Sequence, residues 1–143
     1  MKRDLLTPDF FEVPQAAAPV AATMNYSAEL AHLLSEVFVE SGLSRYQIAA
    51  EVSRLTGKEV SKAMLDGYTS EARETFNLPM YLVPAIETAC RTHKITAWLA
   101  GKRGARILVG RETLNAELGK LENERLRISE NIKQLRRYMG QDA

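Results

Sequence analysis

Near its C-terminal end the chain carries a regular seven-residue repeat, which constrains the fold more than any other feature of the sequence. From Arg111 to Met139 there is no proline, Gly119 is the only glycine, and the Glu, Leu, Lys, Arg and Asn content favours a helix. Such a helix is about 43 Å long at 1.5 Å per residue. Its apolar residues recur at alternating steps of four and three, at Leu114, Leu118, Leu121, Ile128, Ile132, Leu135 and Met139.

This spacing is that of a coiled-coil seam, which a helix buries against another helix. Since no other segment is left over to cover so regular a stripe, we expect residues 111–143 to pair with a second copy, as a homodimer or higher oligomer. A helix folded back on its own domain is the alternative. Arg125 stands at an inner position, where it costs stability but fixes register or orientation if it reaches Glu122 or Glu124 of the partner helix.

Composition narrows the class of protein. The 143 residues, 45% hydrophobic and 26% charged, suit one globular domain with appendages. No apolar run approaches the roughly 20 residues of a membrane helix, so we expect no membrane association. Asp9 and Glu12 make the N-terminus a poor signal peptide, and a single cysteine, Cys90, suits a reducing compartment. We therefore expect a cytoplasmic protein.

Residues 1–24 have the composition of a flexible leader, to which no fold is assigned. They are rich in alanine after Phe11 and contain Pro8, Pro14 and Pro19. An arm that docks on a partner through Phe10, Phe11 and Val13 is the alternative interpretation.

Residues 25–101 show the periodicity of several short helices. A first helix is expected to begin with Ser27 as its N-cap and to bury one face. A fourth begins either at Asn77, as cap, or later near Pro84, because proline is tolerated only in a first turn. A fifth short helix follows, with Trp98 in the core.

The second and third helices have the best-marked ends. Ser44 is the expected N-cap of the second helix, with Gln47 completing a capping box, and Gly57 is expected to end it in the left-handed conformation. After a short turn Ser61 caps a third helix through Leu65. Two short helices joined by a turn form a helix-turn-helix pattern. The predicted fold class is therefore all-α: a compact helical bundle with a helix-turn-helix, followed by a long C-terminal coiled-coil helix.

The segments Leu43–Ala49 and Val60–Leu65 resemble the lambda-repressor-like helix-turn-helix family of DNA-binding proteins. The chain departs from the family pattern in two places. Between Ala49 and Val60 it is longer than the family's usual step by roughly one helical turn, and Asp66-Gly67 replaces the usual continuation of the recognition helix. A small protein of this kind with an appended oligomerisation helix also suits a phage or prophage regulator. The residues at the family's core positions are Leu43, Ile48, Ala49, Val60 and Leu65.

The resemblance implies that the third helix enters the major groove of double-stranded DNA. Lys62, Ala63 and Asp66 would then read bases, next to the cap Ser61. Arg45 and Tyr46 match family positions that hold the phosphate backbone, which sets register and supplies salt-sensitive affinity. The implied function is that of a sequence-specific transcriptional regulator acting as a dimer, since two copies read two half-sites.

The distribution of charge supports DNA binding in one segment but not in another. Between Ser44 and Phe76 basic and acidic residues balance, so a solvated surface on an ordinary helical hairpin is the alternative. Residues 102–110 are expected to form a basic linker, or a short strand over Ile107–Val109. Such a linker is either a plain solvated loop or a second DNA contact through Lys102, Arg103 and Arg106.

Nothing in the sequence favours an enzyme, a cofactor or a metal site. His32, His93 and Cys90 stand in no metal-ligand spacing, and there is no phosphate-binding glycine motif. The rival from another class is a protein-protein adaptor, in which the C-terminal helix pairs with a different partner and the helical domain is a docking surface.

Overall fold

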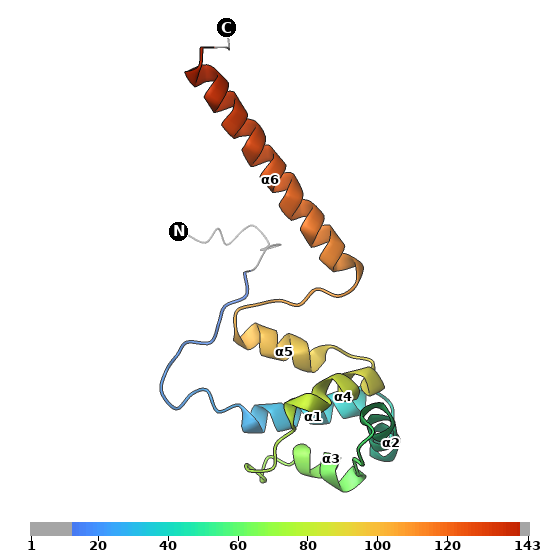
Figure 1. The fold of residues 1–143 in the computed structure, drawn as a ribbon. Coiled ribbons are helices and arrows are strands. Elements are labelled where there is room, and N and C mark those ends of the chain that lie inside the picture. Colours follow the sequence, from blue (N-terminus) through green and yellow to red (C-terminus); the bar gives the residue numbers. More distant parts are fainter. Residues whose placement is uncertain (1–12, 141–143) are drawn as a thin grey trace, which may run out of the picture. The chain divides into compact units, whose positions relative to one another are not determined.

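A computed structural model describes residues 13–140, which contain six α-helices, one 3-10 helix and no strand. The fold is all-helical, as predicted. The chain divides into two units after Arg106 (Figure 1). The elements of the first unit are α1 (Ser27–Glu40), α2 (Arg45–Thr56), α3 (Lys62–Tyr68), η1 (Met80–Leu82), α4 (Val83–Cys90) and α5 (Lys94–Lys102), and the second contains α6 (Arg111–Tyr138).

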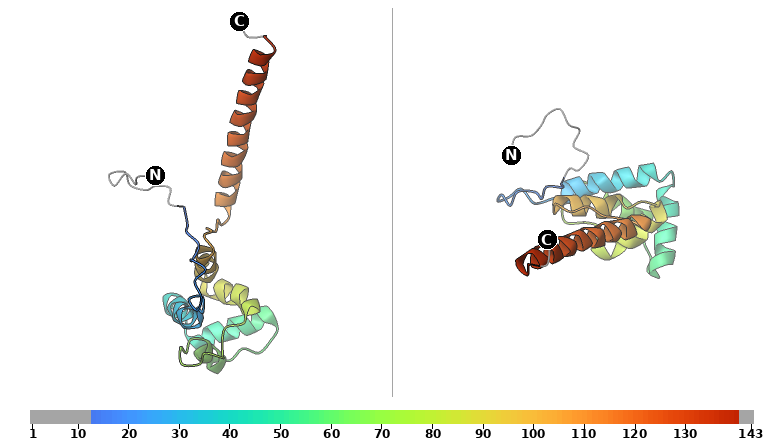
Figure 2. Two further views of the ribbon diagram at one scale, coloured as in Figure 1. Left: turned by 90° about the vertical axis from the view of Figure 1, so that its left-hand side faces the viewer. Right: turned by 90° about the horizontal axis from the view of Figure 1, so that it is seen from above.

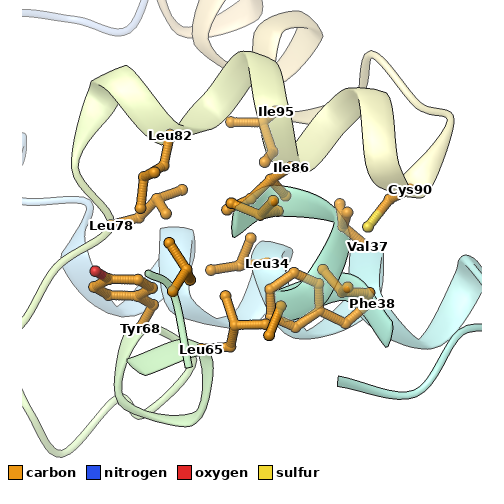
Figure 3. Packing of buried hydrophobic residues seen from close by; sticks show 14 of the residues in the cluster. Leu34, Val37, Phe38, Leu65, Tyr68, Leu78, Leu82, Ile86, Cys90 and Ile95 are labelled. Carbon is orange, nitrogen blue, oxygen red and sulfur yellow. The ribbon is translucent and has the colours of Figure 1, made fainter. Parts of the chain in front are cut away.

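Helix α4 lies at the centre of the first unit, because it packs against α1, α2 and α5. Side chains from all these helices and from α3 point into one shared core (Figure 3). Burial of such apolar side chains is the main favourable contribution to folding. The largest side chains that are fully buried are Leu34, Val37, Ile48, Val52, Leu65, Leu82 and Ile86.

The predicted ends of α2 and the start of α3 are confirmed. The Ser44 hydroxyl accepts a hydrogen bond from Gln47 N at 3.2 Å, and the Gln47 side chain accepts one from Ser44 N at 2.8 Å. Gly57 ends α2 at φ 69°, a conformation that glycine adopts without steric cost. The Ser61 hydroxyl caps α3 by accepting from Met64 N.

Two other predicted caps are wrong. Ser27 is the first residue of α1, and its N–H donates to the side chain of Asn25 at 3.2 Å. Asn77 caps no helix, because its side chain donates to the carbonyl of Glu74. Helix α4 instead begins at Val83 with Pro84 in its first turn, the later of the two predicted starts.

The start of α5 is capped by a carboxylate from a neighbouring helix. Glu87 of α4 is buried, and its Oε2 accepts hydrogen bonds from the backbone N–H groups of Ile95 and Thr96, both at 3.1 Å. The Thr96 hydroxyl donates a hydrogen bond to Oε1 of Glu87. A negative charge at a helix N-terminus is favourable because it satisfies unpaired N–H groups and opposes the helix dipole.

Trp98 of α5 is half-buried against the core rather than fully inside it. Its indole N–H donates to Glu29 at 2.9 Å, and its ring meets Tyr26 edge-on, with centroids 5.8 Å apart. A polar N–H that needs a partner explains this position at the edge of the core.

The described part of the N-terminal segment, from residue 13, is not wholly detached from the domain. Ala17 N donates to the carbonyl of Lys102 at 3.0 Å, and Ala16 forms an isolated bridge with Arg103. Gly104 is required beside this bridge, because a Cβ there would lie 2.7 Å from Ala16 N. Phe10 and Phe11 lie outside the described residues.

The second unit contains no strand in its described residues. Ile107–Val109 is irregular chain in the single copy. A strand at this position would need a second copy as partner for its backbone groups, so the alternative of a short strand stays a prediction. Helix α6 follows as one uninterrupted helix in both views of Figure 2, and none of its side chains is buried.

We expect Glu87→Ala to lower the free energy of unfolding by about 1–3 kcal/mol, because it leaves buried N–H groups of α5 unsatisfied. Thermal unfolding followed by circular dichroism measures this loss. Glu74→Ala is the matched control, since Glu74 is exposed and makes no side-chain bond among the described residues. Equal midpoints for the two variants would show that the cap contributes nothing.

Candidate nucleic-acid interface

Helices α2 and α3 form the helix-turn-helix unit that the sequence predicts. The turn between them is held by Ser53 of α2, whose hydroxyl accepts from Val60 N at 2.9 Å and lies 3.0 Å from Val60 O. Val60 itself is buried in the core. These two contacts of Ser53, the Ser53 clasp, connect the end of the turn to the last turn of α2. They accommodate the longer step between Ala49 and Val60.

The structure brings three of the predicted site residues together around one carboxylate. Asp66 Oδ1 of α3 lies 2.7 Å from Arg45 Nη1 of α2, and Asp66 Oδ2 lies 2.7 Å from Lys62 Nζ. Arg45 also donates to the Thr69 hydroxyl at 2.8 Å. These four residues, the Asp66 cluster, join the first turn of α2 to both ends of α3.

Aromatic rings complete the surroundings of the two cations. The Arg45 guanidinium lies 5.5 Å from the centre of the Phe38 ring, and Lys62 Nζ lies 5.6 Å from that of Tyr46. Ring faces attract cations at such distances. Tyr46 is 70% exposed, so its ring extends the cluster towards solvent.

The cluster keeps its charges at neutral pH. Hydrogen bonds from Lys62 and Arg45 lower the pKa of the Asp66 carboxyl, and the bond to Asp66 raises the pKa of the Lys62 amine. With two cations around one anion, the cluster carries one net positive charge. The charge is small, but it is held in a fixed place on the surface of α2 and α3.

The outward face of α3 consists of predicted base-reading residues. Ala63 is exposed, whereas Lys62 and Asp66 are partly exposed and Leu65 is fully buried on the opposite face. Ser61 is engaged as the helix cap, so its hydroxyl already has a partner.

Asp66-Gly67 does not interrupt α3, which continues to Tyr68. Gly67 is buried under the ring of Phe76, and a Cβ at this position would lie 2.4 Å from that ring. The Phe76 ring also stacks on Tyr68, with centroids 5.0 Å apart. A glycine is therefore needed here because the loop after α3 folds back onto the helix.

The predicted basic segment, which begins at Lys102, the last residue of α5, lies elsewhere. Lys102 Nζ pairs with Glu29 at 2.8 Å and sits 4.7 Å from the centre of the Tyr26 ring, while Arg103 takes part in the bridge to Ala16. Arg106 is exposed. Since α5 and α3 lie on opposite sides of the bundle in Figures 1 and 2, the structure does not bring the two predicted DNA contacts onto one surface.

Comparison with protein-family models, curated proteins and solved structures found no match to this chain. Across residues 13–140 no helix combines the length and apolar character needed to cross a bilayer. In that same part of the chain no group of His, Cys, Asp and Glu side chains is placed to hold a metal ion.

Sequence reasoning missed two residues of this region, Ser53 and Thr69. Ser53 acts through hydrogen bonds to Val60, seven residues on, and Thr69 through one from Arg45, 24 residues back. No periodicity marks either residue. The sequence spacing indicates only one of the ion pairs of Asp66. Lys62 and Asp66 are four residues apart and so share one face of α3.

Asp66 should make the stability of the protein depend on pH in acid. Its pKa is lower in the folded state than the value of about 3.9 in an unfolded chain. The stabilisation is thus fully present above the unfolded pKa and is lost as pH falls through the folded pKa. We expect Asp66→Asn to lower the thermal midpoint at about pH 6, and this difference to shrink below about pH 4.

The control for this measurement is Glu74→Gln, which removes an exposed carboxylate that has no ion pair among the described residues. Its midpoint should follow that of the wild type throughout. A difference between wild type and Asp66→Asn that stays constant down to about pH 2 would contradict the proposed ion pairs.

Proposed function

We propose that this protein is a sequence-specific DNA-binding regulator of transcription that acts as a dimer in the cytoplasm. The observation that supports it most strongly is the Asp66 cluster, which gathers Arg45, Lys62 and Asp66 on the exposed side of a capped helix-turn-helix. The resemblance to lambda-repressor-like proteins assigns DNA contacts to the same positions.

In this proposal the first turn of α2 holds the phosphate backbone. Backbone N–H groups at a helix N-terminus attract anions, and Arg45 adds a fixed positive charge beside them. Tyr46, largely exposed, extends the contact. Such contacts position the protein on DNA without reading sequence.

Helix α3 would then read bases in the major groove through its outward face. Lys62 suits the acceptors of guanine, Ala63 the methyl group of thymine, and Asp66 the amino group of cytosine. Because Asp66 binds both cations in the free protein, phosphate and bases compete with it for them. Binding therefore exchanges ion pairs within the protein for contacts with DNA.

A dimer fits this function because α3 is short and reads few base pairs. Two copies joined through α6 would read two half-sites and combine their binding energies. We accordingly expect a roughly palindromic operator. The size of the protein and its appended helix suit a phage-like regulator.

A protein-protein adaptor is the second candidate, and an apolar groove on the first unit favours it. The groove, about 360 Å³ in volume, lies between α1, the η1–α4 segment and α5. Met80 at its edge is largely exposed. Its walls are formed by Leu30, Leu78, Met80, Val83, Pro84, Ile95, Thr96, Trp98 and Leu99.

The test is binding of the purified protein to DNA fragments that flank its own gene, at several salt concentrations. We expect one fragment to bind tightly, with an affinity that falls steeply as salt rises. Arg45→Ala should reduce the slope of log K against log salt by about 0.9 for each phosphate that the variant no longer neutralises. Lys62→Ala should weaken binding to the preferred fragment on the order of ten-fold.

Arg54→Ala is the matched control, because Arg54 lies at the other end of α2 and its ion pair is with Glu51, outside the Asp66 cluster. It should bind like the wild type. If no fragment binds even at low salt, the DNA-binding proposal is wrong and the adaptor becomes the better one. Weakening of the same size in Arg54→Ala would mean that the Asp66 cluster is not the interface.

A further inference from the structure

Helix α6 exposes a complete apolar seam. Every apolar member of the heptad repeat, from Leu114 to Met139, is between 46% and 68% exposed, and Arg125 completes the pattern without an ion pair among the described residues. Nothing within residues 107–140 covers this stripe. An exposed apolar stripe of this length, interrupted only at Arg125, marks an interaction site.

We propose that α6 pairs in antiparallel orientation with α6 of a second copy of this chain, about a centre between Leu126 and Arg127. The inference rests on the self-association in the proposed function, but not on DNA binding. The repeat places Leu118, Arg125, Ile132 and Met139 at one set of core positions, conventionally a, and Leu114, Leu121, Ile128 and Leu135 at the other, d.

The seam matches itself when its direction is reversed. In an antiparallel pair each a position faces a d position of the other helix. Around the proposed centre no core position is left unpaired, and Arg125 faces an apolar residue rather than its own copy. The layers are Leu114 with Met139, Leu118 with Leu135, Leu121 with Ile132, and Arg125 with Ile128 of the second copy.

The charged residues beside the seam also favour the antiparallel orientation. A parallel pair places Glu117 next to Glu122 of the second copy, twice by symmetry, and stacks the two Arg125 side chains in one layer. Like charges placed together disfavour a pairing. The parallel dimer therefore places two Arg125 side chains together in the core and brings Glu117 next to Glu122 on both sides of the seam.

The antiparallel pair has no such conflict. Its flanking contacts are Glu117 with Tyr138, Glu124 with Asn131, Asn115 with Arg136, and Glu122 with Ser129. Arg125 lies about one turn, ~6 Å along the axis, from Glu124 of the second copy, a distance that its long side chain can span. The two arginines can thus pair reciprocally with two glutamates instead of repelling each other.

The area is sufficient for a stable dimer. Complete burial of the exposed parts of the seven apolar seam side chains in both copies removes on the order of 1,400 Å² from water, within the range of about 1,200–2,000 Å² for specific interfaces. The N-terminal ends of the two α6 helices then lie about 47 Å apart along the axis. Each copy therefore attaches its first unit at a different end of the pair.

Disulfide trapping tests the orientation on the full chain in a Cys90→Ala background, which removes the single natural cysteine. Leu118→Cys and Leu135→Cys are prepared separately, one carrying a mass tag, and are oxidised alone and after equimolar mixing. We expect a covalent heterodimer in the mixture, with at least roughly ten-fold less dimer for either variant alone. In an antiparallel pair each cysteine is about 25 Å from its own copy, too far for a disulfide.

Lys120→Cys and Lys133→Cys form the matched control pair, because they lie at one level of the proposed pair but outside its seam. Their mixture should not cross-link. Sedimentation equilibrium of the wild type should give twice 16.0 kDa. Self-cross-linking of Leu118→Cys alone, or a monomeric wild type, would overturn the proposal. Because no DNA is present, these outcomes are independent of whether the protein binds DNA.

Discussion

The packing of α4 against α2 is the constraint on which the rest of the first unit depends. Leu82 and Ile86 are fully buried in the same core as Ile48 and Val52 of α2. Helix α4 also contacts α1 and α5, and so it holds α2 in place within the bundle. The first turn of α2 carries part of the candidate interface. The clasp of Ser53 on Val60 then orients α3 relative to α2.

In the candidate interface the same carboxylate, that of Asp66, both orders the two cations and offsets part of their positive charge. Asp66 holds Arg45 and Lys62 in place, so the cations are ordered before any ligand arrives. The same carboxylate lowers the net charge that would attract DNA from a distance. In the proposed function phosphate would have to compete with this internal partner, which would favour selective binding over non-specific attraction.

Helix α6 is governed by a different constraint. Its stability as a helix follows from composition, but its apolar seam has no cover within its own unit. The order of acidic and basic residues beside the seam distinguishes orientations of the pair that the apolar residues alone leave equivalent. In the proposed pair the acidic side chains of α6 would specify the orientation, while the leucines and isoleucines would supply the driving force.

The sequence by itself determined the all-helical class, the capped ends of α2, the start of α3 and the extent of α6, because caps and periodicity are local signals. It misplaced the caps at Ser27, whose N–H bonds the side chain of Asn25, and at Asn77, whose side chain bonds the carbonyl of Glu74. Only the tertiary structure decided that Glu87 caps α5, that Ser53 holds the turn, that Gly67 makes room for Phe76, and that Lys102 pairs with Glu29 away from α3. Each of these depends on a contact between different elements of the fold, separated by seven residues or more, which capping patterns and helix periodicity do not encode.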